Sequence, residues 1–196
     1  MLDKTFAWDQ LSSETAQVLF CDLQKDIVRH SETTPARALS SAAGALLQLA
    51  KLFSLPTIIS VVPDGNNPPQ VIAELSGIDG FAPEMLRATA SLFGDAATTQ
   101  AIARSSRRVL IVAGFMMEAV VLNTVLDALA LGYEVIVAVD ACGSPSARTE
   151  QAVLRQMESA GAITTSVVSI GTKLSPDFST DIGKQMFEIV QGIKAA

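Results

Sequence analysis

The stretch VLIVAGFMMEAVVLNTVLDALALGYEVIVAVD, residues 109–140, decides the fold class. It begins and ends with short runs rich in Val, 109–114 and 134–140, which are typical of buried strands. Between these runs, residues 118–131 have apolar side chains at helical spacing, and Gly132 follows as a residue favoured just after a helix. A strand, a helix and a second strand in this order predict a βαβ unit with parallel strands.

The same alternation continues along the chain in both directions. Further strands are predicted at 16–23, 57–62, 85–89 and 163–169, and further helices at 35–53, 95–105, 146–160 and 176–194. This order predicts an α/β fold: a doubly wound, mostly parallel six-stranded sheet with helices on both faces, in three α/β/α layers. No repeat or linker interrupts the pattern, and 196 residues suit one core, so we predict a single domain over residues 1–196.

The composition excludes several classes of protein. Hydrophobic residues make up 49% of the chain, which argues against disorder, and the net charge of −6 makes nucleic acid a poor partner. The longest apolar run, 109–117, is too short to span a membrane, and the chain begins without an apolar segment of signal-peptide length. Two cysteines are too few for a disulfide scaffold, so we expect a cytoplasmic protein that binds neither membranes nor nucleic acid.

In a doubly wound sheet, ligands bind beyond the carboxyl ends of the strands. Asp22 and Gln24 follow the first strand, and the apolar turn Phe115-Met116-Met117 follows the strand at 109–114. A carboxylate at a buried strand end is partly desolvated, which raises its pKa and suits it to proton transfer, although such an Asp also caps turns. The apolar turn suits either a substrate wall or simple packing.

Other site types find no support in the residues. The chain has neither a Walker A run nor a G-x-G-x-x-G loop, so no nucleotide cofactor is expected. His30 is the only histidine, which argues against a metal site and against a Ser–His–Asp triad. Cys142, Ser144 and Ser146 follow the strand at 134–140 and are possible nucleophiles, but a buried Cys is the commoner fate.

Two segments carry a resemblance to a known family. VLFCDLQKDIV, residues 18–28, and VLIVAGFMMEAVVLNTVLDALALGYEVIVAVDACGSPS, residues 109–146, resemble signature blocks of the isochorismatase-like (cysteine hydrolase) superfamily. The resemblance implies an Asp–Lys–Cys triad that hydrolyses amides such as nicotinamide and N-carbamoyl compounds. In such a triad Asp activates the thiol and Lys lowers the pKa of the thiol.

The resemblance places substituted residues at two of the three catalytic positions. Asp22 matches the Asp, but Arg87 stands nearest the Lys position and Val120 stands six residues after Gly114, at the Cys position. Met117 occupies the turn position that is Thr in most relatives, and the family's Asp–His–His metal site finds no match. We expect Asp22 to be retained as an acid or base. We expect Gln24 and the turn Phe115-Met116-Met117 to contact a ligand.

Three functional hypotheses follow. The first is a member with a degenerate site that binds an unidentified small molecule and forms a homo-oligomer, as the resemblance implies. The second is a hydrolase without a nucleophile, in which Asp22 acts as general acid on a vinyl ether, as in true isochorismatases that resemble this fold. The third is a hydrolase that uses an unconventional nucleophile such as Cys142, Ser144 or Ser146. None of the three calls for a cofactor.

Overall fold

The computed structural model describes residues 7–65, 67–77 and 80–194, so the two termini of the predicted domain and one residue of the loop DGNNPP lie outside it. Its core is a six-stranded sheet in the order β3-β2-β1-β4-β5-β6. All five strand pairs are parallel, where we predicted a mostly parallel sheet. The strand order reverses between β1 and β4, which places the ligand crevice of such sheets at their carboxyl ends.

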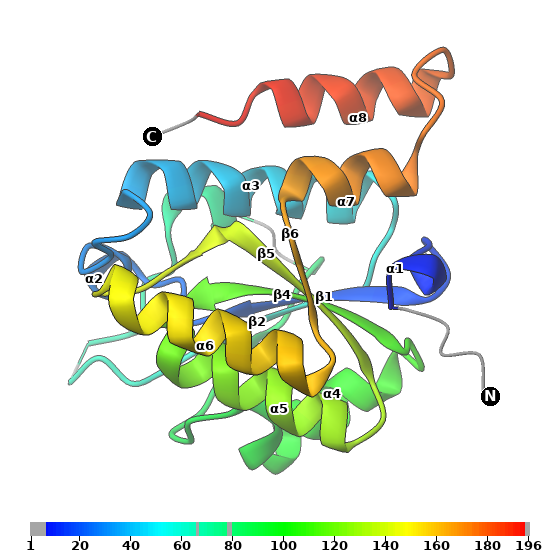
Figure 1. The fold of residues 1–196 in the computed structure, drawn as a ribbon. Helices are drawn as coiled ribbons and strands as arrows, with labels where there is room; N and C mark the ends of the chain where they lie inside the picture. Colours follow the sequence, from blue (N-terminus) through cyan, green and yellow to red (C-terminus); the bar gives the residue numbers. More distant parts are fainter. Residues whose placement is uncertain (1–6, 66, 78–79, 195–196) are drawn as a thin grey trace.

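The strands and helices alternate as predicted over most of the chain (Figure 1). The strands are β1 (Ala16–Cys21), β2 (Thr57–Val61), β3 (Glu84–Leu86), β4 (Val109–Phe115), β5 (Glu134–Gly143) and β6 (Ile163–Thr165). The helices are α1 (Ala7–Gln10), α2 (Lys25–Val28), α3 (Ala36–Leu52), α4 (Ala96–Arg104), α5 (Leu122–Ala130), α6 (Ala147–Ala160), α7 (Val167–Leu174) and α8 (Asp181–Gln191). A π-helical turn, Met117–Val121, precedes α5, and 3-10 turns lie at Ala73–Leu75 and Leu92–Gly94.

The two faces of the sheet bury two separate hydrophobic clusters. In β1, Val18 and Phe20 pack in the cluster under α3 and α7, whereas Leu19 and Cys21 pack in the cluster with α4, α5 and α6. This alternation follows from the period of two along a strand. Figure 1 shows α8 above α3 and α7, outside the three layers. No described helix is long and apolar enough to cross a bilayer.

The central strands come unusually close at one position. Cys21 pairs with Gly114 across β1 and β4, and a Cβ added at Gly114 would lie 2.3 Å from the Cys21 carbonyl oxygen. Only glycine therefore fits at this point. The close approach lies at the strand ends that lead into the predicted crevice.

The C-terminal third contains the main errors of the prediction. The strand predicted at 163–169 ends at Thr165, because the Ser166 side chain accepts the Ser169 N–H at 3.2 Å and caps α7. The β-branched residues after Ser166 are typical of strands but lie in this helix. The helix predicted at 176–194 begins only at Asp181, after a cap by Thr180.

Candidate active site

Asp22 lies at the point where the strand order reverses. It follows β1 directly, has a positive φ of 54°, and its N–H donates to the Ser60 carbonyl of β2 at 3.0 Å. Asp is one of the few residues with a side chain that populate this left-handed region. The residue is 6% exposed, so its carboxylate is almost removed from solvent.

Arg87 is the principal partner of this carboxylate. It follows β3, is 3% exposed, and donates from Nη2 to Oδ2 of Asp22 in a buried salt bridge. Its Nε donates to Ser60 Oγ at 2.8 Å, and its Nη1 donates to the Thr89 carbonyl. Ser60 Oγ in turn donates to Oδ1 of Asp22 at 3.1 Å. Each guanidinium nitrogen thus already has a protein acceptor, and the ends of β1, β2 and β3 are joined.

The environment leaves Asp22 a weaker acid than a solvated aspartate. Burial is the largest influence and raises its pKa, while the positive charge of Arg87 and the hydrogen bonds from Ser60 and Arg87 lower it. The net pKa lies above the ordinary value, so the carboxyl group retains a tendency to take up a proton despite its cationic partner.

A cavity of about 300 Å³ opens beside this pair. Val120 in the π-helical turn lies in its wall, 4% exposed, together with Phe115 and Met116. The peptide bond between Phe115 and Met116 is cis. The full wall consists of Asp22, Ile27, Val62, Arg87, Thr89, Ala90, Phe115, Met116, Ala119 and Val120. The structure therefore brings together the three positions that the family resemblance assigned to the triad.

The structure places two of the predicted ligand contacts, Gln24 and Met117, outside the cavity wall. The Gln24 side chain donates to the Val62 carbonyl at 3.1 Å and accepts its N–H at 2.7 Å, so both ends of the amide are used within the protein. Met117 is 1% exposed and packs in the cluster with α4, α5 and α6. Neither side chain belongs to the cavity wall.

The thiols lie outside the cavity wall. Cys21 and Cys142 are fully buried, and burial raises the pKa of both thiols, to about 12 for Cys142. Ser144 is buried as well, with a hydroxyl that has no hydrogen-bond partner, and Ser146 precedes α6. Among the described residues, no group of three or more His, Cys, Asp and Glu side chains is placed to hold a metal ion.

Ser60 and Thr89 are the site residues that sequence reasoning missed. Ser60 is a fully buried polar residue in the apolar strand TIISV, and that contrast is the one signal that marked it. Thr89 takes part through its main-chain carbonyl, which no side-chain pattern reveals.

Comparisons with known proteins agree with this fold. The family model described as "Isochorismatase domain" matches residues 16–169. Isochorismatase domain-containing protein 2 from Homo sapiens is 32% identical over 149 residues, covering 75% of this chain and 69% of that protein. YcaC from Pseudomonas aeruginosa, solved with hexane-2,5-diol and covalent acrylamide, superposes with a TM-score of 0.86 at 28% identity, covering 93% of this chain and 91% of that one.

A second bacterial structure is equally similar in fold. YcaC from Escherichia coli, described as an octameric hydrolase of unknown specificity, has a TM-score of 0.86 and 25% identity, covering 93% of this chain and 90% of that one.

We predict that Arg87→Met destabilises the protein strongly at pH 8 and less at pH 5. Loss of the cation leaves Asp22 buried without its partner, which typically costs about 3–5 kcal/mol. The folded-state pKa of Asp22 then rises further, so the stability of the variant is greatest at low pH and falls as the pH rises through that pKa. Urea denaturation at both pH values measures the difference.

Arg29→Met is the matched control, because Arg29 forms an exposed ion pair with Asp26. Its stability should stay close to that of the unmodified protein at both pH values. An equal loss for Arg87→Met at pH 5 and pH 8 would contradict the assigned role of the pair.

Proposed function

The chain belongs to the isochorismatase family, and we propose that it keeps the hydrolase fold and cavity of that family but lacks thiol-based hydrolysis of C–N bonds. In this proposal the cavity beside Asp22 binds a small molecule, and the protein acts as a homo-oligomer. The proposal rests on one observation: the side chain that lies in the cavity wall with Asp22 and Arg87 is Val120, not a cysteine.

Valine removes the step on which the family chemistry depends. Its side chain has no lone pair to attack a carbonyl, and no described thiol lies in the cavity wall to replace it. Arg87 does not compensate, because a guanidinium is permanently charged and its three nitrogens already donate to Asp22, Ser60 and Thr89.

The cavity itself supports binding of a small, largely apolar molecule. Phe115, Met116, Ala119 and Val120 supply apolar wall, and its volume of about 300 Å³ lies at the lower end of the range for ligand pockets. The Asp22–Arg87 pair supplies the polar part of the wall. A ligand with one polar group on a compact apolar body fits this chemistry.

Val120→Cys should create a reactive thiol where the unmodified protein has none. The new sulfur would lie in the cavity near Asp22, whereas the two natural thiols are fully buried with raised pKa values. Acrylamide is a suitable probe, because a covalent acrylamide is present in the Pseudomonas aeruginosa YcaC structure. Intact-mass spectrometry should show one adduct on the variant and none on the unmodified protein.

Val121→Cys is the control, because Val121 is fully buried in the adjacent cluster and outside the cavity wall. It should react much more slowly than Val120→Cys. Rapid modification of the unmodified protein, or equal rates for the two variants, would contradict the assignment of Val120 to the nucleophile position.

The raised pKa of Asp22 favours one alternative function. A buried carboxyl group with a raised pKa keeps its proton more readily than a solvated aspartate, and in its protonated form it can act as general acid on a vinyl ether without a nucleophile. Against this, the branched side chain of Val120 fills space, and Arg87 already uses three of its five N–H donors on Asp22, Ser60 and Thr89, which leaves two for a substrate carboxylate. No comparable observation favours Cys142 or Ser144 as an unconventional nucleophile.

If the general-acid alternative is correct, the protein releases pyruvate from isochorismate, and Asp22→Asn abolishes the release because it removes the proton donor. A coupled assay for pyruvate measures both. Under the degenerate-site proposal, isochorismate gives no pyruvate above the background of the Asp22→Asn preparation.

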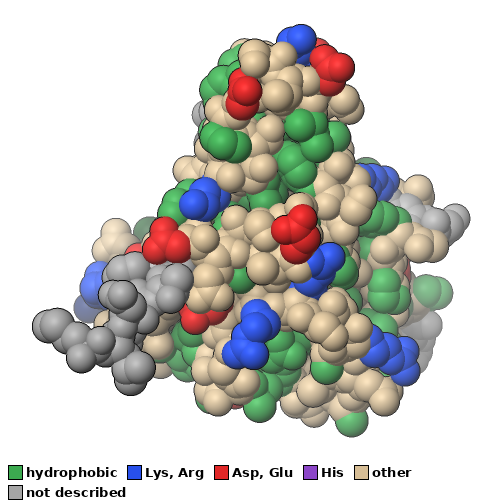
Figure 2. All heavy atoms as spheres, turned by 90° about the vertical axis from the view of Figure 1, so that its right-hand side faces the viewer, with side chains coloured by type: hydrophobic (Ala, Val, Ile, Leu, Met, Phe, Trp, Pro, Cys, Tyr) green, Lys and Arg blue, Asp and Glu red, His purple; other side chains and the backbone are tan. Residues whose placement is uncertain are grey.

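Association in solution is the second part of the proposal. Four exposed hydrophobic side chains lie on α7, α8 and their connection: Val168, Phe178, Ile182 and Phe187, each 40–46% exposed. Phe178 and Phe187 stack with ring centroids 5.4 Å apart. Figure 2 shows hydrophobic side chains on the raised part of the molecule that carries α8. The E. coli relative is described as octameric, which supports the proposal that this protein also forms a homo-oligomer.

Light scattering should therefore give a mass at least twice that of the 20.6 kDa chain. Phe187→Ser should weaken the assembly, because it removes an exposed aromatic ring from this patch, whereas Leu86→Ser, at another exposed hydrophobic residue on β3, should leave it intact. A monodisperse monomer of the unmodified protein would contradict this part of the proposal.

A further inference from the structure

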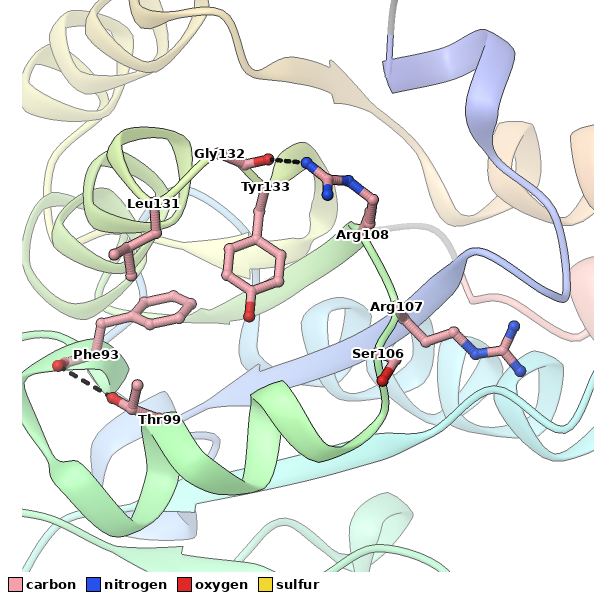
Figure 3. Close-up of a pocket in the computed structure, with 8 residues that line it drawn as sticks. All are labelled: Phe93, Thr99, Ser106, Arg107, Arg108, Leu131, Gly132 and Tyr133. Atoms are coloured by element: carbon pink, nitrogen blue, oxygen red, sulfur yellow. Dashed lines mark hydrogen bonds between the residues drawn. The ribbon is translucent and has the colours of Figure 1, made fainter.

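A second cavity lies at the opposite end of β4 from the Asp22 site. Arg107 and Arg108, which precede the strand, line it, whereas Phe115 at the far end of the strand lines the first cavity. A seven-residue strand separates the two by about 20 Å. The second cavity has a volume of about 360 Å³ and is formed by the start of α4, the approach to β4 and the turn between α5 and β5 (Figure 3).

An aromatic pair forms one wall of this cavity. The rings of Phe93 and Tyr133 have centroids 5.6 Å apart and are tilted by 39°. Leu131 is 60% exposed, and Figure 3 shows its side chain directed toward Phe93. These three side chains offer a partly exposed apolar surface on which a flat ring can pack.

Several polar groups around this wall are unused by the protein. Within the described ranges, no hydrogen bond reaches the hydroxyl groups of Tyr133 or Ser106 or the guanidinium of Arg107. Arg108 makes one side-chain hydrogen bond, from Nη2 to the Gly132 carbonyl at 3.2 Å, and this bond holds its guanidinium beside Tyr133 in Figure 3. The remaining donors of Arg108 are available to a ligand.

The charged side chains that line the cavity are positive, whereas the chain as a whole is negative. Its lining includes Arg107 and Arg108 but neither Asp nor Glu, although the protein carries a net charge of −6. None of the salt bridges among the described residues involves these two arginines. Figure 3 shows the Arg107 side chain directed away from the rings, whereas the Arg108 guanidinium lies at the Gly132 end of Tyr133, so Arg108 is the cation on the side of the aromatic wall. A guanidinium in this position favours a carboxylate.

We propose that this cavity binds a small aromatic carboxylate, with its ring against Phe93 and Tyr133 and its carboxylate on Arg108. Neither feature alone defines this ligand class. The aromatic wall selects a flat apolar body, and the unpaired cation selects a negative charge at its edge.

The chain contains a single tyrosine, which serves as a probe inside the cavity. Protein labelled with ¹³C-tyrosine gives one set of ring resonances, from Tyr133, and these can be followed while benzoate is added. We expect a saturable shift with benzoate. Benzamide, which has the ring without the charge, and acetate, which has the charge without the ring, should each bind at least about tenfold more weakly.

Variants of two arginines separate this site from general electrostatic attraction. Arg108→Gln should weaken benzoate binding by about tenfold or more while leaving the weak benzamide binding unchanged. Arg104→Gln is the control, because Arg104 is exposed on α4, hydrogen-bonds to Gln100 and lies outside the cavity wall. Both side chains are exposed, so both variants should fold.

The proposal is overturned by any of three results. The Tyr133 resonances do not respond to benzoate, or benzoate binds no more tightly than benzamide or acetate, or Arg104→Gln weakens benzoate binding as much as Arg108→Gln does. Hydrolytic activity enters none of these readouts, so the outcome is independent of the function proposed for the Asp22 cavity.

Discussion

The salt bridge between Asp22 and Arg87 is the constraint on which the site depends. Both side chains are almost fully buried, and a buried charge without a partner is costly. Asp22 directly follows β1 and Arg87 directly follows β3. Ser60 of β2 hydrogen-bonds to both side chains. The three strand ends must therefore keep their relative positions, and this requirement holds one side of the cavity in place.

The same pair supports the proposal that the site binds a small molecule and does not perform thiol chemistry. A lysine carries its charge on one nitrogen, which can move between a thiol and a carboxylate. The planar guanidinium of Arg87 is instead held by hydrogen bonds from its three nitrogens to Asp22, Ser60 and Thr89. Val120 across the cavity adds volume without reactivity. Both substitutions keep the space filled and the charges balanced, so the proposed loss of thiol chemistry is compatible with the fold of the family.

Much of this arrangement is readable from the sequence, for physical reasons that differ between elements. The buried strands β1, β4 and β5 and the amphipathic helices α3, α5 and α6 have strong periodic signals, and their predicted bounds lie close to the observed ones. Helix α7 was missed because its residues are β-branched and one serine cap, Ser166, outweighs that preference. Cross-strand bonds of Ser60 and the internal pairing of Gln24 with Val62 depend on register and turn geometry, which side-chain patterns do not specify.

The proposed function requires that the Asp22 cavity lacks a working nucleophile. The most direct test incubates the unmodified protein with nicotinamide and a set of N-carbamoyl compounds, and measures ammonia release together with the intact protein mass. The Asp22→Asn protein, prepared in the same way, gives the background. We expect neither an acyl adduct nor ammonia above that background. An acyl adduct together with ammonia release that disappears in Asp22→Asn would contradict the proposed loss of thiol chemistry.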